Sequence, residues 1–179
     1  MPDLLLLRHG QSQWNLENRF TGWIDVPLAP RGEAEARAAG EKLRGRRIDK
    51  LFTSVLVRAT ETARLALETA GIGPLPADSP YDVGGDRRYA GIAVPDTESL
   101  KDTIARALPY YEAEIVPALS AGKRVLVAAH GNSLRGIIKY LSNIGDDEIV
   151  GLEIPTGKPI VYELAHDLSV VRRHYLDEA

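Results

Sequence analysis

Residues 4–10 read Leu4-Leu5-Leu6-Leu7-Arg8-His9-Gly10, an apolar run that ends in an arginine, a histidine and a glycine. A short apolar run closed by glycine is typical of a buried strand. In open α/β sheets, ligands bind in the crevice beyond the carboxyl ends of the strands. We therefore expect His9 to lie at a binding or catalytic crevice.

The chain repeats this arrangement once. A second apolar run spans Val125 to Ala129 and is followed by His130-Gly131-Asn132-Ser133. If the two strands are neighbours, two histidines, an arginine and two glycine-opened turns meet at one place. Such a group of side chains suits covalent phosphoryl transfer, because histidine is a nucleophile and arginine neutralises phosphate charge.

The rest of the chain alternates between segments with the apolar spacing of a helix and short segments typical of strands. Helical spacing predicts helices over 32–43, over 55–70 behind a Thr53-Ser54 cap and before Gly71, over 97–119 with a kink or break at Pro109, and over 133–142. Further strands are expected at 51–52, 160–164 and 169–174. Together they predict an α/β three-layer sandwich with a mostly parallel central sheet flanked by helices, as a single domain over residues 1–179.

Composition excludes several classes of function. The formal net charge is −3, so the chain has no overall basic field for nucleic acid, and any anion site must be a local group of arginines. Cysteine is absent, which excludes disulfides and thiolate metal sites. No segment approaches the ~20 apolar residues that span a bilayer, and four leucines are too short for a signal peptide core. We expect a cytoplasmic protein with neither a nucleic-acid nor a membrane partner.

Four side chains carry the expected chemistry. His9 is the candidate nucleophile, with one ring nitrogen held by a backbone carbonyl; the alternative is a structural histidine at a strand end. Arg8 and Arg58 can each donate a bidentate pair of hydrogen bonds to phosphate oxygens, and His130 can add one more hydrogen-bond donor. The alternatives are a solvated helix arginine for Arg58 and a capping histidine for His130. Arginines and histidines neutralise the charge, so no metal is required.

Several motifs are similar to those of one known family. They read LRHGQSQWN at 7–15, NRFTGW at 18–23, FTS at 52–54 with Arg58-Ala59, ESL at 98–100, AAHGNSLRG at 128–136, PTG at 155–157 and PIVYEL at 159–164. This pattern resembles the cofactor-dependent phosphoglycerate mutases of the histidine phosphatase superfamily. The resemblance covers nearly the whole chain except its middle.

The resemblance implies a reaction and a set of site residues. The reaction interconverts 3-phosphoglycerate and 2-phosphoglycerate through a phosphoenzyme primed by 2,3-bisphosphoglycerate, without a metal. The family tends to form homo-oligomers. By the resemblance His9 is phosphorylated, His130 stabilises the transferring group, and Arg8, Arg58 and Asn15 hold the phosphate. The remaining positions assigned to the substrate pocket are Gly10, Gln11, Ser12, Thr21, Gly22, Gly131 and Asn132.

The middle of the chain departs from the family pattern. The family carries a Glu-Arg-x-Tyr-Gly stretch whose glutamate is the general acid and base, then a lysine, and later an Arg-Arg pair. This chain has only Asp86-Arg87-Arg88-Tyr89. In one alignment Asp86 replaces the catalytic glutamate. In the other, Arg87, Arg88 and Tyr89 match the later substrate-binding stretch, and the glutamate and lysine are missing. We favour the second, because the flanking residues match better.

Loss of a general acid typically costs ~10²–10⁴ in rate. The carboxylates available in the middle are Asp82, Asp86, Asp96 and Glu98. The sequence therefore predicts a retained phosphate pocket with weak mutase activity. The alternatives are a small phosphomonoesterase, in which water takes the phosphoryl group, and a protein that binds a phosphorylated ligand with little or no turnover.

Overall fold

The computed structural model describes residues 1–19, 21–73 and 99–176. Its sheet has the strand order β2-β3-β1-β4-β5, formed by β1 (Asp3–Arg8), β2 (Lys50–Thr53), β3 (Val125–Ala129), β4 (Ile160–Leu164) and β5 (Val170–Tyr175). The β1–β3 and β2–β3 pairs are parallel, whereas β4 is antiparallel to β1 and β5. Four of these five strands thus run in one direction, as the sequence predicted.

The leucine run forms the middle strand because the sheet is covered on both faces. Successive side chains of a strand point to opposite faces. Leu4 and Leu6 accordingly join one apolar core with Val125 and Val127, whereas Leu5 and Leu7 join a second core. A strand buried on both sides reads as a continuous apolar run.

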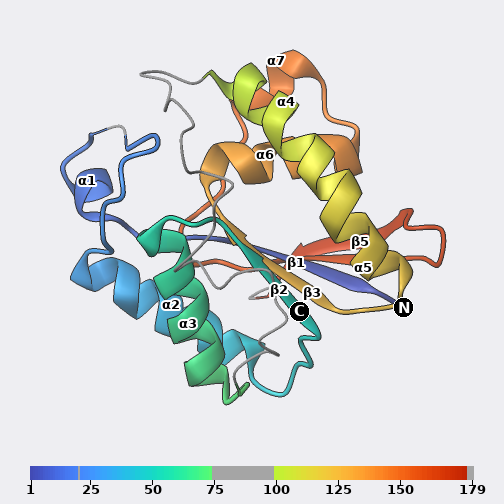
Figure 1. Ribbon diagram of the computed structural model, residues 1–179, viewed down its shortest axis with the longest axis horizontal. Coiled ribbons are helices and arrows are strands. Elements are labelled where there is room, and N and C mark those ends of the chain that lie inside the picture. Colours follow the sequence, from blue (N-terminus) through green and yellow to red (C-terminus); the bar gives the residue numbers. More distant parts are fainter. Residues whose placement is uncertain (20, 74–98, 177–179) are drawn as a thin grey trace.

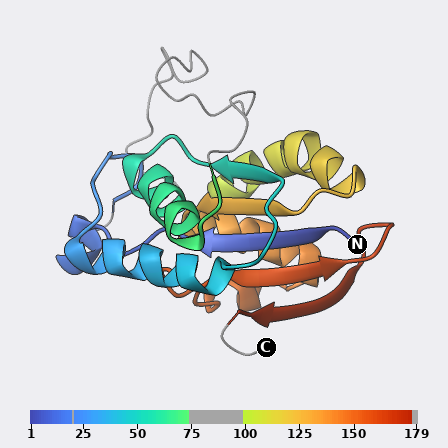
Figure 2. The ribbon, with the colours of Figure 1, turned by 90° about the horizontal axis from the view of Figure 1, so that it is seen from below.

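Helices cover both faces of the sheet (Figures 1 and 2). On one face α2 (Pro30–Leu43) packs against α3 (Val57–Ala70), and Gly40 allows close approach because a Cβ there would lie 2.4 Å from the Ala66 carbonyl oxygen. The other face carries α4 (Leu100–Tyr110), α5 (Val116–Ser120) and α6 (Gly131–Ser142), with α7 (Asp146–Val150) beyond them. The predicted three-layer sandwich is confirmed.

The predicted 97–119 helix is interrupted just after Pro109, as expected: α4 ends at Tyr110, and the π-helical turn η3 (Tyr111–Ile115) separates it from α5. A proline lacks one N–H, and a wider turn after it lets the helix resume. One prediction about a helix start was wrong. The start of α3 is not capped by Thr53-Ser54, because the cap residue is Leu56 and no side chain caps it.

The short helix α1 (Gln13–Leu16) has no counterpart among the predicted elements. Its cap is Ser12, whose side chain accepts a hydrogen bond from the Asn15 backbone, while the Asn15 side chain returns to the Ser12 backbone. This reciprocal capping box stabilises a helix too short for a periodic apolar pattern. Among the described residues, no helix combines the length and the apolar character needed to cross a membrane.

Candidate active site

The candidate site lies where the three parallel strands end. Arg8 closes β1, Ser54 follows β2 and His130 follows β3, so the shared strand direction brings all three to one edge of the sheet. The His9 amide donates to the Ala129 carbonyl at 3.0 Å and extends the ladder into the site. A cavity of about 510 Å³ opens here and is lined by Arg8, His9 and His130 among other residues.

His9 is held in one tautomer and one orientation. Its Nδ1 lies 2.7 Å from the Gly10 carbonyl oxygen, which can only accept, so Nδ1 carries the proton and Nε2 keeps its lone pair. The residue is only 4% exposed, although it lines the cavity. Burial lowers the pKa of His9 to about 4, and the charges of Arg58 and Arg8 act in the same direction. The His9 ring is therefore unprotonated at neutral pH, which leaves the lone pair of Nε2 available.

His130 stands beside His9 and is oriented by a serine. The two ring centroids are 5.1 Å apart at an interplanar angle of 60°. The Ser54 hydroxyl lies 2.6 Å from His130 Nε2, and the Leu56 amide donates to the same hydroxyl oxygen at 3.3 Å. Burial, followed by the charges around it, lowers the pKa of His130 well below its usual value. Both histidines are thus neutral in the free protein at pH 7.

Arg8 and Arg58 are tied to the walls of the cavity by their terminal nitrogens. Arg8 Nη1 donates to the Ile154 carbonyl at 2.7 Å. Arg58 Nη1 and Nη2 donate to the carbonyls of Ile24 and Gly22 at 2.8 and 2.9 Å. The Nε atoms of both arginines, and Nδ1 of His130, are buried and have no hydrogen-bond partner within residues 1–19, 21–73 and 99–176. An unpaired buried polar group costs about 1–3 kcal/mol, and an oxyanion in the cavity could satisfy such donors.

The turn that carries His9 is held in place by contacts with α3 and α2. The Gly10 amide donates to Thr62 Oγ1 at 3.0 Å, and that hydroxyl donates to the Arg58 carbonyl at 2.6 Å. Gly10 also meets α2 backbone to backbone, since a Cβ at Gly10 would lie 2.2 Å from the Gly32 oxygen. One helix thus holds both the His9 turn and Arg58, and a second helix supports the turn from its other side.

The structure separates the expected pocket residues into two groups. The cavity lining includes Asn15, Thr21, Gly22, Gly131 and Asn132. The other group, Gly10, Gln11 and Ser12, is not part of that lining: the Gln11 amide donates to Glu35 Oε2 at 2.9 Å, and Ser12 caps α1. The substrate contacts assigned to both groups remain predictions.

The residues predicted for the middle of the chain lie outside the described residues. They are Asp82, Asp86, Arg87, Arg88, Tyr89, Asp96 and Glu98. Among the residues that the structure does describe, the cavity lining contains five arginines, two histidines and no carboxylate. In the same ranges, no three His, Asp or Glu side chains are grouped so that they could hold a metal ion.

Sequence reasoning missed part of the lining. Ser54 was taken as a helix cap, whereas its hydroxyl contacts His130. Arg106 also lines the cavity, on the same face of α4 as Thr103. The spacing of three residues between Thr103 and Arg106 is the signal that was available, because such residues share a helix face. The two further arginines in the lining are Arg19 and Arg135.

Fold and site together define an α/β protein with two adjacent histidines in an arginine-lined cavity at the ends of parallel strands. The family described as the histidine phosphatase superfamily (branch 1) matches residues 4–79. The 2,3-bisphosphoglycerate-dependent phosphoglycerate mutase of Sphingopyxis alaskensis is 49% identical, over 99% of this chain and 100% of the relative. The enzyme of the same name from Novosphingobium aromaticivorans is 48% identical over the same shares. The chain belongs to the 2,3-bisphosphoglycerate-dependent phosphoglycerate mutase family, which confirms the resemblance.

Among solved structures, Bacillus stearothermophilus YhfR superposes with a TM-score of 0.74 and 23% identity, over 95% of this chain and 94% of that chain. This likeness confirms the α/β fold. The alignment with the Sphingopyxis relative runs over 227 residues, against 179 in this chain, so the relative has at least 48 residues without a counterpart here. The shortening is therefore real, and its assignment to the middle segment remains a prediction.

Proposed function

We propose that this chain interconverts 3-phosphoglycerate and 2-phosphoglycerate through a phosphohistidine at His9, primed by 2,3-bisphosphoglycerate. The observation that carries the proposal is the presentation of His9 Nε2. Its Nδ1 is bonded to the Gly10 carbonyl at 2.7 Å, inside a cavity lined by arginines. Membership of the mutase family supplies the reaction for which this nucleophile is suited.

The described residues fit a bisphosphorylated ligand. Three buried nitrogen atoms, on Arg8, Arg58 and His130, have no hydrogen-bond partner among the described residues, and all three residues line one cavity. Five arginines in that lining could balance the charge of two phosphates. When bound, 2,3-bisphosphoglycerate would supply the phosphoryl group that loads the protein, with Arg8 and Arg58 holding its oxygens.

The protein's part in the transfer is an in-line displacement. The lone pair on His9 Nε2 attacks phosphorus, a P–N bond forms, and the bond from phosphorus to the substrate oxygen breaks. Arg8, Arg58 and His130 stabilise the charge on the equatorial oxygens. In the second half the free hydroxyl of a monophosphoglycerate attacks the phosphorus of the phosphohistidine, a new P–O bond forms, and the P–N bond breaks. Burial keeps His9 neutral, so the attacking lone pair is present at neutral pH.

A proton has to reach the leaving oxygen in the first half and leave the attacking hydroxyl in the second. The described cavity lining holds no carboxylate for this step. In the favoured alignment no residue replaces the family's glutamate, and we propose weak mutase turnover. In the other alignment Asp86 is the candidate for the proton step. If Asp86 shuttles the proton, Asp86→Asn lowers turnover by ~10²–10⁴ and leaves phosphate binding nearly unchanged. An Asp86→Asn variant with wild-type turnover removes Asp86 from the mechanism.

The decisive experiment follows 3-phosphoglycerate with and without 2,3-bisphosphoglycerate and records both 2-phosphoglycerate and free phosphate. We expect 2-phosphoglycerate that depends on the bisphosphate, together with an acid-labile mass increase of one phosphoryl group. His9→Gln is the matched control and should show neither. Free phosphate without isomerisation would instead indicate a phosphomonoesterase, and binding without either product would indicate a ligand-binding protein.

The remaining expectations are proposals as well. We propose that the small phosphorylated substrate is the principal partner and that the enzyme works in the cytoplasm, as its place in the mutase family suggests. Homo-oligomer formation is proposed on the same basis. Sedimentation at several protein concentrations tests it: a single monomeric species throughout would contradict it.

A further inference from the structure

The peptide group between Gly10 and Gln11 connects the His9 ring to helix α2. Its carbonyl oxygen lies 2.7 Å from His9 Nδ1 and accepts the proton of that nitrogen in a hydrogen bond. Its N–H donates to Glu35 Oε2 at 2.9 Å. A trans peptide is planar, and its C=O and N–H point to opposite sides. One rigid group therefore has the histidine ring on one side and a carboxylate on the other.

The Glu35 carboxylate uses its two oxygens for different partners. Oε1 accepts from Arg31 Nε at 3.1 Å, but the Arg31 side chain is 74% exposed, so water and salt screen its charge. Oε2 is bonded to the Gln11 amide, a charge-assisted hydrogen bond. Burial and the charge of Arg135 lower the pKa of Arg8, whereas the charge of Glu35 raises it. The negative charge of Glu35 thus acts on the site, although Glu35 does not line the cavity.

The position of this peptide matters because the residue before it is a glycine. Close packing against α2 leaves no room for a side chain at Gly10, and glycine has more backbone freedom than any other residue. If the peptide rotated, its carbonyl would leave Nδ1 of His9. The ring proton could then move to Nε2, the nitrogen that attacks phosphorus in the proposed reaction. A bond to the N–H of the same peptide opposes that rotation.

We infer that Glu35 is a positioning residue: its carboxylate holds the Gly10–Gln11 peptide in the orientation that keeps the His9 proton on Nδ1 and leaves Nε2 unprotonated. A negative acceptor on the N–H also polarises the peptide and strengthens the bond that its carbonyl accepts. A carboxylate thereby orients a histidine, as in hydrolytic triads, but through an intervening peptide group. The effect on the ring is independent of the proposed function, whereas the effect on turnover rests on it.

The ¹⁵N chemical shifts of the His9 ring test the inference in the free protein, because protonated and unprotonated ring nitrogens resonate far apart. Glu35→Ala removes the acceptor of the Gln11 amide, whereas Glu35→Gln keeps an oxygen acceptor and removes the charge. Glu33→Ala is the matched control, since Glu33 is an exposed carboxylate of the same helix that pairs with Arg37 at 3.3 Å. Comparison with His9→Gln identifies the signals of the ring.

We expect Nδ1 to be protonated and Nε2 unprotonated in the wild-type chain and in Glu33→Ala. In Glu35→Ala both shifts should move toward intermediate values, because the two neutral tautomers then exchange. Glu35→Gln should move them in the same direction by a smaller amount. Melting temperatures show which variants are folded, and Glu35→Gln alone decides if Glu35→Ala is not.

Phosphorylation is the second measurement. In a single turnover with 2,3-bisphosphoglycerate, the rate of phosphohistidine formation should fall about tenfold in Glu35→Ala and about threefold in Glu35→Gln. The dissociation constant of the bisphosphate should change by about twofold or less, because Glu35 is not part of the cavity lining. A residue that only supports the fold would weaken binding as much as it lowers the rate.

Wild-type ring shifts in the folded Glu35 variants would overturn the inference, as would the same change of shifts in Glu33→Ala. An altered ring signal with an unchanged rate of phosphorylation would overturn the part of Glu35 in the reaction. If the ring signal changes as expected but the wild-type chain forms no phosphohistidine, the proposed function is contradicted and the positioning of His9 by Glu35 is supported.

Discussion

Ser54 shows how a single hydroxyl can serve a neighbour that its position in the sequence does not indicate. A Thr-Ser pair between a strand and a helical pattern predicts a helix cap. In the folded chain β2 and β3 are parallel neighbours, so their ends meet, and Ser54 Oγ lies 2.6 Å from His130 Nε2. The contact spans 76 positions in sequence, and no local pattern reports it.

Ser54→Ala should lower kcat about tenfold with a smaller effect on KM, because it leaves a ring nitrogen of His130 without its partner and the ring less well oriented. Ser54→Thr should restore most of the rate by returning a hydroxyl. The measurement is steady-state kinetics across pH, in which the alanine variant should also shift the acid limb. A purely structural role for Ser54 predicts a lower melting temperature with an unchanged pH profile.

The depressed pKa of His9 makes the stability of the fold depend on pH. In the unfolded chain the ring titrates near its usual pKa of 6.5, whereas in the folded chain it titrates at about 4. Between these values the unfolded state binds more protons, so the contribution of His9 is fully present above pH 6.5 and is lost as pH falls toward 4. Lowering the pH from 7.5 to 5 should cost about 2 kcal/mol from His9 alone.

Urea unfolding at these two pH values tests this expectation. His130 titrates in the same direction and adds to the loss. The His9→Gln variant should show a clearly smaller pH dependence than the wild-type chain, since it removes one of the two groups. Identical pH dependence in both proteins would contradict the burial of a neutral His9.

At the scale of secondary-structure elements, the turn after His9 packs so closely against the start of α2 that position 32 has no room for a side chain. A Cβ at Gly32 would lie 2.1 Å from the Gln11 carbonyl oxygen. Gly32→Ala should therefore destabilise the fold by roughly 1–3 kcal/mol and displace the turn that carries His9. Gly73→Ala is the control, because nothing lies within 4 Å of a Cβ there.

Denaturant unfolding and the phosphohistidine mass shift together test the Gly32 prediction. We expect Gly32→Ala to lose both stability and phosphorylation, and Gly73→Ala to retain both. If Gly32→Ala were as stable as the wild-type chain, the two backbones would have room to separate, and α2 would not position the nucleophile.

Long elements were predictable from the sequence, and short ones were not. The strand expected at 160–164 is β4 with the same bounds, and the helix expected to end before Gly71 does so, with Gly71 in the left-handed conformation. β4 is almost fully buried and so reads as an apolar run, and α3 has 14 residues over which its period can be recognised. The short helices α1 and α7 lack such a pattern: a capping box between Ser12 and Asn15 defines α1, and no side chain caps α7.

The site was predictable to the extent that it follows from strand ends. Arg8, His9 and His130 come directly after or within apolar runs, and the sheet brings them together as expected. Arg106 and Ser54 reach the cavity through tertiary packing, which a single sequence does not encode locally. The candidate carboxylates for the proton transfer all lie within residues 74–98, outside the described residues.

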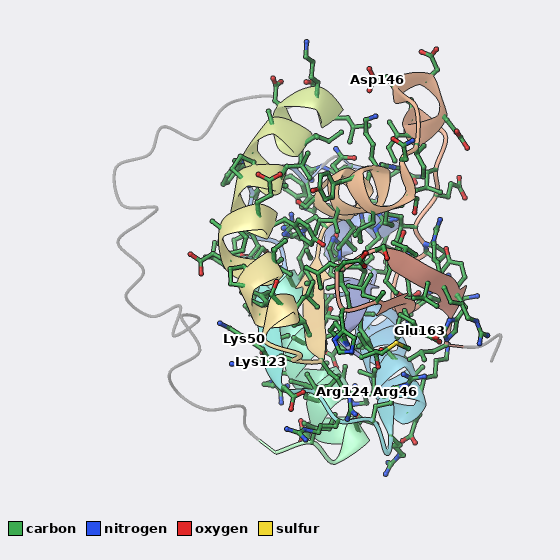
Figure 3. The ribbon with its side chains drawn as sticks, turned by 90° about the vertical axis from the view of Figure 1, so that its right-hand side faces the viewer. Arg46, Lys50, Lys123, Arg124, Asp146 and Glu163 are labelled. Atoms are coloured by element: carbon green, nitrogen blue, oxygen red, sulfur yellow. The ribbon has the colours of Figure 1, made fainter. Side chains whose placement is uncertain are left out.

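On the scale of the whole molecule, positive charge gathers at both ends of the sheet. Opposite the cavity, Lys50 is the first residue of β2, and Lys123 and Arg124 lead into β3 (Figure 3). The Arg124 amide donates to Asp49 Oδ2 at 2.9 Å. Arg46 lies in the same region of the figure. The cavity differs from this basic end, because two of its arginines, Arg8 and Arg58, have a buried Nε atom with no hydrogen-bond partner in the described part of the chain.

Ligand binding should therefore stabilise the whole fold. A ligand at 100 times its dissociation constant adds about 2.7 kcal/mol, which corresponds to a rise in melting temperature of roughly 5–10 °C for a chain of this size. We expect this rise with 3-phosphoglycerate, and none with sodium chloride at the same ionic strength. An unchanged melting temperature over a wide range of 3-phosphoglycerate concentration would mean that the cavity is vestigial.

The position of β1 in the sheet also affects how the molecule opens. β1 is paired on both sides, with β3 and β4, and its leucines are buried in both cores. Backbone amides in such a strand exchange with solvent only when most of the molecule opens, whereas β5, at an edge with exposed valines, can open alone. The turn that presents His9 continues directly from this slowest-exchanging strand. Fraying of the edges should thus leave the nucleophile in place, and deuterium should enter residues 4–8 last.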